Sequence, residues 1–212
     1  MIEFKTFVFN PLQVNTYLIF DNQTNEGWLI DPGNNREKEN VVLSNFIGIN
    51  GITISKVFNT HGHIDHLFGL NYVKENISDE IYFPFPDLVL LEHIERQSDM
   101  IGMPISKIEK PKHDLQSFKE IALGDSKVEI RKTPGHSPGG TVLVFHSDKK
   151  VITGDTLFYE SIGRTDIWGG DFATLKNSIE TQIFTLPNEY EILPGHGPIT
   201  TVGHEKKNNP FL

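Results

Sequence analysis

The stretch His61-Gly62-His63-Ile64-Asp65-His66 places three imidazoles and one carboxylate within six consecutive residues. A tetrahedral metal site takes four ligands around one ion, and side chains this close along one chain cannot all serve the same ion. The same side chains fit a pair of neighbouring ions, provided that other parts of the chain complete each site. The stretch therefore predicts the centre of a site for two metal ions.

Three later segments share one small pattern, in which a predicted strand is followed by a glycine and then by a residue that can bind a metal. The pairs are Gly135-His136 after a strand over 128–133, Gly154-Asp155 after 150–153, and Gly195-His196 after 190–193. Glycine allows backbone conformations and close approaches that a Cβ would block, so the next side chain can turn into a shared cavity. The pattern supplies three further candidate ligands.

The rest of the chain alternates between strand-like and helix-like runs of apolar residues, which predicts an α/β fold. Further strands are expected over 4–9, 14–20, 27–30, 54–59 and 141–145, the first three successive and antiparallel, and helices over 35–48, 67–75, 86–97 and 171–184. Residues 98–120 are predicted to be irregular, and the aromatic run 82–86 to be core and turn. Two strand-rich halves, each backed by helices, follow from this order.

Length and composition limit the protein class. A chain of 212 residues with 37% hydrophobic content can bury one substantial core, so a single domain over 1–212 is expected. A net charge of −9 without a basic run argues against a nucleic-acid partner. No apolar run approaches the roughly 18 residues of a membrane span, and no leader pattern opens the chain, so we expect a cytoplasmic protein without membrane contact. The absence of cysteine leaves His and Asp as metal ligands.

Five motifs in order make the chain resemble the metallo-β-lactamase superfamily, and within it the single-domain glyoxalase II-like hydrolases. They are Leu29-Ile30-Asp31-Pro32-Gly33, the His61–His66 stretch, Thr133-Pro134-Gly135-His136-Ser137-Pro138-Gly139, Gly154-Asp155-Thr156-Leu157-Phe158, and Leu193-Pro194-Gly195-His196-Gly197. The resemblance implies an αββα sandwich with the site at the edge of the two sheets. Only residues 197–212 follow His196, so the C-terminal helical domain that binds glutathione in two-domain relatives is not expected.

The resemblance also implies a ligand set and a catalytic centre. One metal is expected on His61, His63 and His136, and the second on Asp65, His66 and His196, with Asp155 bridging them. Two divalent ions are implied, with zinc expected and iron or manganese also compatible with His and Asp ligands. Asp65 and Asp155 are the expected catalytic residues, because Asp65 would help position a hydroxide that bridges the metals. The remaining histidines, His93, His113, His146 and His204, match no motif and are expected to bind no metal.

Three further residues are candidates with open roles. Asp31 is either a turn residue of the Asp-Pro-Gly segment or a residue that orients a metal ligand. Arg164, in the Gly-Arg-Thr-Asp segment that resembles the single-domain branch, either binds a glutathione carboxylate or forms an ion pair with an acid such as Asp166. Tyr159, from the same loop, is a candidate substrate-binding residue.

The leading functional prediction is hydrolysis of an acyl thioester, with S-lactoylglutathione or a similar 2-hydroxyacyl thioester as the best guess. A thiolate leaves readily because thiols have a pKa near 8.5, so no general acid is required. The main alternative is a persulfide dioxygenase with one iron on His61, His136 and Asp155. A lactonase or β-lactamase and a metal-stabilised interaction module are further alternatives, and the sequence leaves the oligomeric state open.

Overall fold

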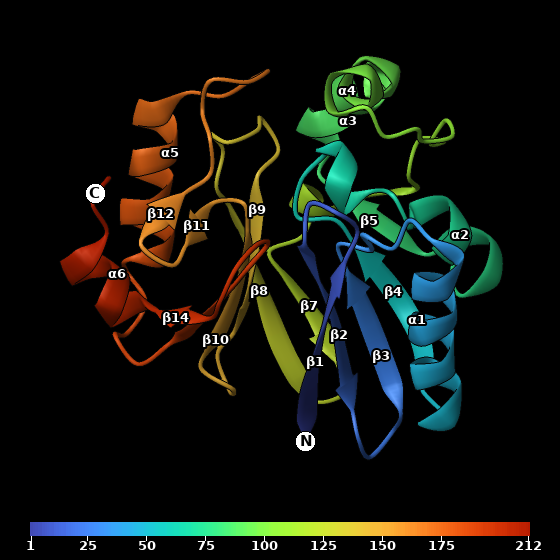
Figure 1. Cartoon of the computed structure of the whole chain (residues 1–212). Helices are drawn as coiled ribbons and strands as arrows, with labels where there is room; N and C mark the ends of the chain where they lie inside the picture. The colour runs from blue at the N-terminus through green and yellow to red at the C-terminus, as the bar shows by residue number, and fades with distance from the viewer.

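A computed structural model describes all 212 residues of the chain. Two six-stranded sheets lie face to face, and helices cover the outer side of each sheet (Figure 1). Helices α1 (Glu37–Ile49) and α2 (Leu70–Asn76) cover the first sheet, whereas α5 (Phe172–Ser178) and α6 (Val202–Asn208) cover the second. The four layers confirm the predicted αββα sandwich. None of the helices is both long enough and apolar enough to span a membrane.

The first sheet is formed by the N-terminal half of the chain. Its strands are, in spatial order, β1 (Ile2–Phe9), β2 (Val14–Asp21), β3 (Glu26–Ile30), β4 (Thr53–Phe58), β5 (Ile81–Phe83) and β6 (His113–Asp114). The first three strands pair antiparallel, as predicted, and the remaining pairs are parallel. Because β3 and β4 are parallel, both end at the same edge of the sheet.

The second sheet is formed by the C-terminal half. Its strands are, in spatial order, β14 (Thr200–Thr201), β13 (Glu191–Pro194), β10 (Lys150–Gly154), β9 (Thr141–Phe145), β8 (Ser126–Lys132) and β7 (Glu120–Leu123). β9 is antiparallel to both β8 and β10, and β13 is parallel to β10. Three strands, β8, β10 and β13, therefore end at one edge. A separate small hairpin pairs β11 (Leu157–Phe158) with β12 (Ser161–Ile162).

Successive side chains of the central strands enter different cores. In β2, Tyr17 and Ile19 pack between the two sheets, whereas Leu18 packs beneath the helices of the first layer. In β9, Leu143 packs between the sheets and Val144 packs against the helices of the fourth layer. Full burial of such a side chain contributes about 1.5–3 kcal/mol, so a shift of one residue in the strand pairing would lose packing on both faces. Strands buried on both faces explain the continuous apolar runs in the sequence.

The helix predicted over 86–97 is two helices in the structure. α3 (Leu88–Glu92) and α4 (Ile94–Ile101) are separated by His93, whose φ of −110° and ψ of 24° lie outside the helical region. The ring of His93 packs against Trp168, with 4.6 Å between the ring centroids. Both helices keep apolar residues on their buried side, so the apolar spacing in the sequence does not reveal the break.

Other element boundaries also differ from the sequence expectation. The predicted helix over 171–184 is α-helical only to Ser178, and a π-helical segment, Ile179–Ile183, continues it. The predicted helix over 67–75 starts at Leu70, after a short 3-10 turn. The region 98–120 is not wholly irregular, because it includes the end of α4, β6 and a 3-10 turn. Helix α6 and the short strands β5, β6, β7, β11, β12 and β14 were not predicted, since segments this brief carry little periodicity.

Candidate metal centre

The ends of five strands, β3, β4, β8, β10 and β13, bring the metal-binding motifs to one edge of the sandwich. Backbone hydrogen bonds join the two sheets at this edge. Thr141 donates to the carbonyl of Thr60 at 3.0 Å, and Asn15 donates to the carbonyl of Gly195 at 2.8 Å. Loops from the two halves of the chain are therefore held together by main-chain contacts as well as by packing.

All seven predicted metal ligands lie together at this edge. They form three overlapping groups, within each of which the candidate ligand atoms lie no more than 4.8 Å apart: His61, His63 and His136; His61, His66 and Asp155; and Asp65, His66 and His196. No other group of three His, Asp or Glu side chains in the protein has this geometry. The structure thus gathers residues from four separate loops into one cluster.

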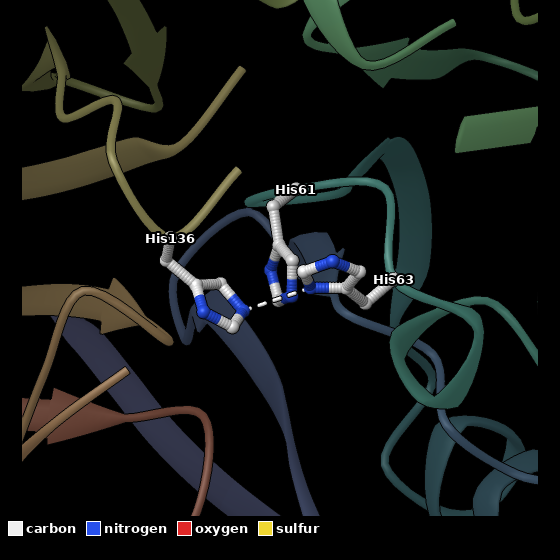
Figure 2. A group of neighbouring side chains, drawn as sticks. All are labelled: His61, His63 and His136. Carbon is white, nitrogen blue, oxygen red and sulfur yellow. Dashed lines mark hydrogen bonds between the residues drawn. The ribbon is translucent and has the colours of Figure 1, made fainter. Parts of the chain in front are cut away.

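The first group is centred on three imidazoles that point toward one another (Figure 2). Nδ1 of His63 lies 2.8 Å from Nε2 of His136. The other ring nitrogen of His136 lies 2.8 Å from the carbonyl oxygen of Arg164, and Nδ1 of His61 lies 3.0 Å from the hydroxyl of Thr60. A hydrogen on Nδ1 satisfies the carbonyl of Arg164, so Nε2 of His136 presents a lone pair to the cluster.

The second group is built in the same way. Nε2 of His196 lies 3.2 Å from Oδ2 of Asp65, and Nε2 of His66 lies 3.8 Å from the same oxygen. On their outer sides, Nδ1 of His196 lies 3.0 Å from the carbonyl oxygen of Leu12, and Nδ1 of His66 lies 3.1 Å from Oδ2 of Asp31. These outer contacts orient both rings with Nε2 toward the cluster.

The carboxylate of Asp155 lies between the two groups. Its Oδ1 is 3.2 Å from Nε2 of His66, and its Oδ2 is 3.6 Å from Nε2 of both His136 and His196. A Cβ on Gly195 would lie only 2.2 Å from Oδ1 of Asp155. Glycine at that position therefore allows the chain after β13 to approach the carboxylate, which accounts for one of the three Gly-ligand pairs.

Asp31 lies beneath the cluster and is completely buried. Its Oδ1 accepts a hydrogen bond from the backbone amide of Thr60 at 2.8 Å, and its Oδ2 accepts one from the Thr60 hydroxyl at 2.7 Å. The same residue forms the turn after β3, with a φ of 51°. Both roles weighed from the sequence are thus compatible with its position, because Asp31 makes the turn and also contacts His66.

Several buried polar atoms of the cluster have no hydrogen-bond partner, which is the strongest structural sign that it fits a metal site. They include Nε2 of His61 and Nε2 of His63. A buried polar atom without a partner costs about 1–3 kcal/mol, and native proteins avoid several of them in one place. Divalent cations would satisfy these lone pairs together, so the His and Asp cluster fits a metal site.

The ionisation of the cluster also suits cation binding. Burial lowers the pKa of His63 to about 3, and burial together with the neighbouring His66 lowers the pKa of His61 well below its usual value. These imidazoles are therefore neutral and keep a lone pair for a metal. Burial opposes ionisation of Asp155, but His66 holds the pKa of this carboxyl well below its usual value. Asp155 thus carries a negative charge.

Asp87 is a structural residue of the site that the sequence did not reveal. It is fully buried, and its Oδ2 accepts hydrogen bonds from the amide of Gly62 and the hydroxyl of Ser137, both at 2.7 Å. Its Oδ1 accepts from the amide of Gly139. Asp87 therefore ties the His61–His66 loop to the loop that carries His136. In the sequence, Asp87 resembles an ordinary helix N-cap, so no pattern marks this role.

A cleft of about 810 Å³ opens onto the seven candidate ligands, which together form the metal cluster. Its floor includes His63, Asp65 and Asp155, and its outer wall is formed by α4 and the loop 164–169. The lining includes Arg164, whose side chain forms the ion pair with Asp166 that was one of its two predicted roles.

The structure places the candidate substrate-binding residue Tyr159 outside this cleft. Its ring stacks on His204 of α6, with 5.1 Å between the centroids, and it is not part of the lining. Tyr159 lies in the turn between β11 and β12, which directs its side chain toward α6. Its neighbour Phe158 is the residue of this hairpin that contacts the cluster, through the ring of His196.

Two curated proteins are similar to this chain over nearly its full length. A probable metallo-hydrolase of Streptococcus pyogenes is 36% identical over 208 residues, which cover 93% of this chain and 85% of that protein. The hydroxyacylglutathione hydrolase GloC of Haemophilus influenzae is 36% identical over 202 residues, which cover 94% of this chain and 93% of that protein.

Solved structures agree with this similarity. The crystal structure of the BLEG-1 B3 metallo-beta-lactamase matches with a TM-score of 0.90 and 32% identity, and covers 99% of each chain. TTHA1623, crystallised in a di-iron-bound form, matches with a TM-score of 0.85 and 31% identity, covering 98% of this chain and 100% of that one. The model of the metallo-beta-lactamase superfamily matches residues 9–196, so this chain belongs to the metallo-beta-lactamase superfamily.

Proposed function

We propose that the protein hydrolyses acyl thioesters and that S-2-hydroxyacylglutathiones, such as S-lactoylglutathione, are its best substrates. The observation that carries this proposal is the position of Asp155 between two ligand groups, with Asp155 and ligands from both groups lining an open cleft. Structural metal sites are enclosed by protein ligands, whereas an open cleft leaves room for water and substrate. The similarity to a hydroxyacylglutathione hydrolase of Haemophilus influenzae supports the choice of substrate class.

The proposed ligand sets are His61, His63 and His136 for one ion and Asp65, His66 and His196 for the other, with Asp155 shared. Two divalent ions bound there would supply a water of lowered pKa and polarise the carbonyl of the substrate. His and Asp ligands accept zinc, iron or manganese, and the similar structure in a di-iron-bound form makes iron a candidate beside zinc.

Asp65 is proposed to orient the attacking water. Its Oδ2 faces His196 at 3.2 Å, and its side chain lines the cleft. Burial opposes ionisation of Asp65, but the neighbouring His66 and His196 lower the pKa of its carboxyl. The ionised group can accept a hydrogen bond from water and so direct an oxygen lone pair toward the substrate carbon.

The cleft suits a leaving group that needs no proton. Apart from the cluster histidines, its lining contains no histidine, lysine, tyrosine or cysteine that could protonate a departing amine. A thiolate can leave unprotonated, because thiols have a pKa of about 8.5. The composition of the wall therefore favours a thioester over an amide.

β-Lactam hydrolysis is a second candidate, because a structure that is 32% identical is described as a B3 metallo-beta-lactamase. A β-lactam carries an amide nitrogen as leaving group, so the missing proton donor counts against it. A direct assay distinguishes the two reactions, because thioester hydrolysis releases a free thiol, whereas hydrolysis of a chromogenic β-lactam changes the colour of the substrate.

The test is to remove bound metal with a chelator, to reload the protein with zinc, iron or manganese, and to assay a panel of thioesters, a lactone and a chromogenic β-lactam. We expect free thiol to be released fastest, and His136→Gln to abolish the release. The matched control is His146→Gln, because His146 lies outside the cluster and contacts Tyr190 and Glu129. Thiol release no faster than that of the chelated protein would overturn the proposal. One iron per chain with oxygen uptake on a persulfide would replace it by the dioxygenase alternative.

A further inference from the structure

Two arginines line the outer wall of the cleft, and only one of them has a free charge. Nε of Arg164 donates to Oδ1 of Asp166 at 2.8 Å, and Nη2 donates to Oδ2 at 2.9 Å. This bidentate pair uses both oxygens of the carboxylate, and the charge of Asp166 compensates that of the guanidinium. The side chain of Arg96 forms no hydrogen bond or ion pair within the protein, although it lines the same cleft. Of the charged side chains that line the cleft outside the metal cluster, Arg96 is therefore the one without a countercharge.

The guanidinium of Arg96 is held in place without using its hydrogen-bond donors. Its central carbon lies 4.4 Å from the centroid of the Trp168 ring, and the ring of His93 packs against the same tryptophan. Stacking contacts the flat face of a guanidinium and leaves the N–H groups at its edge free for a planar anion. The stack also reduces the rotamer freedom that an isolated surface arginine would lose on binding.

Helix α4 fixes Arg96 relative to the metal cluster. The next residue, Gln97, accepts a hydrogen bond at Oε1 from the amide of Ile64 at 3.1 Å, within the loop of metal-binding residues. Nε2 of Gln97 donates to the carbonyl of Leu90 at 2.9 Å, which joins α4 to α3. A group bound to Arg96 would therefore be held at a fixed position relative to the cluster.

We propose that Arg96, held against Trp168, binds a carboxylate on the thiol portion of the substrate, an inference that rests on the proposed thioester hydrolysis. The carbonyl carbon must lie at the cluster, and a short 2-hydroxyacyl group fills only a small part of an 810 Å³ cleft. The remaining space belongs to the thiol portion, which extends toward α4 and the loop 164–169. There Met100 and Ile101 offer apolar surface to its chain, and Arg96 offers the free cation.

The experiment compares two thioesters with the same lactoyl group, one of glutathione, which carries carboxylates, and one of N-acetylcysteamine, which carries none. Arg96→Gln should raise KM for the glutathione thioester about tenfold, the loss expected for a charge-assisted hydrogen bond, with kcat within about twofold. It should leave both constants for the neutral thioester unchanged. Trp168→Leu should raise KM for the charged thioester by a smaller factor, because the arginine stays but loses its support.

Arg164→Gln is the matched control, because it removes the same charge from the same wall but from a paired arginine. It should change KM for either thioester less than about twofold. A second readout without turnover is calorimetric binding of S-methylglutathione, a thioether that cannot be hydrolysed in this way. Its affinity should fall about tenfold in Arg96→Gln and not in Arg164→Gln.

Several outcomes would overturn the assignment of Arg96. The assignment is rejected if Arg96→Gln changes KM equally for both thioesters or for neither, or if Arg164→Gln has the larger effect. In each of these cases the proposed function still stands, provided that the unsubstituted protein hydrolyses the thioesters. If the metal-loaded, unsubstituted protein hydrolyses neither thioester, the proposed function fails and the role of Arg96 fails with it. An unchanged melting temperature of Arg96→Gln would show that altered KM values do not reflect misfolding.

Discussion

The metal cluster and the α4 wall face each other across one cleft, but their side chains are held in different ways. His61, His66 and Asp155 are buried or nearly so, and they contact the hydroxyl of Thr60, the buried carboxylate of Asp31 or one another. Arg96 and Trp168 are exposed and are held mainly by stacking on each other. A buried polar atom must find a partner, whereas an exposed one can exchange partners with water. We therefore expect substitutions in the cluster to affect catalysis and stability, and those in the wall to affect substrate choice.

The largest effect is expected at Asp155, the residue shared by both ligand groups. Asp155→Asn keeps the size of the side chain but removes the charge that both proposed ions would share. Thioester hydrolysis should fall by at least about 1000-fold, equivalent to roughly 4 kcal/mol, and metal content should fall with it. Activity and elemental analysis of the same preparation provide the measurement. Asp166→Asn is the control in the cleft wall. Comparable losses of hydrolysis and metal content in the two variants would contradict the expectation that only the cluster is needed for catalysis.

Acidification should separate the two proposed metal positions. Burial opposes protonation of His66 and His196, but their carboxylate neighbours raise the pKa of both rings, whereas the pKa of His63 is lowered to about 3. In the metal-free protein, His66 and His196 are therefore more readily protonated than His63. A metal must expel these protons, so its affinity at Asp65, His66 and His196 should fall up to about 100-fold per pH unit once both are protonated.

Dialysis at decreasing pH, followed by metal analysis, measures this separation. The metal content should fall from two ions to one before the second ion is lost, and activity should decline below about pH 6. Simultaneous loss of both ions, or an unchanged rate down to pH 4.5, would contradict the expected order.

We expect Asp87 to stabilise the two metal-binding loops that it joins, and not to affect substrate choice as the cleft wall does. Burial raises the pKa of this carboxyl, although three donors converge on its oxygens. Asp87→Asn replaces one acceptor oxygen by an NH2 group that must face a donor. The free energy of unfolding should fall by about 1–3 kcal/mol, and metal affinity by about 10–100-fold.

Chemical denaturation and metal titration of the Asp87 variant measure these two effects. Asp171→Asn is the matched control, since Asp171 is an exposed N-cap that accepts a hydrogen bond from the amide of Thr174, and asparagine caps helices equally well. If Asp87→Asn loses no more stability or metal affinity than this control, Asp87 does not hold the metal-binding loops in place.

The smallest effect is expected at Tyr159. Because its ring stacks on His204 outside the cleft, Tyr159→Ala should change KM for S-lactoylglutathione less than about twofold, as is usual for surface substitutions away from a site. Steady-state kinetics measure this directly. A fivefold rise in KM would show that the loop brings Tyr159 into the cleft when substrate binds.

The sequence was most informative where the chemistry leaves a local pattern. The cluster could be predicted because each ligand follows a strand, and several follow a glycine, so short motifs mark them. Asp87 and Gln97 left no such signal, since each acts on loops distant in the sequence through a single side chain. The break at His93 is not visible in the sequence for a related reason, because apolar residues continue from α3 into α4 across the residue whose backbone leaves the helical region.

By itself, the sequence indicated an α/β fold and a His and Asp cluster, because apolar runs and short motifs are local properties of a chain, and its resemblance to the metallo-β-lactamase superfamily implied the αββα arrangement and the seven ligands. Only the tertiary structure decided which charges are free. Arg164 lies two residues from Asp166 and pairs with it, whereas Arg96 meets Trp168 from a segment 72 positions away in sequence and keeps its charge unpaired. The strength and availability of a charge depend on its neighbours in space, and those neighbours exist only once the sheets and helices have packed.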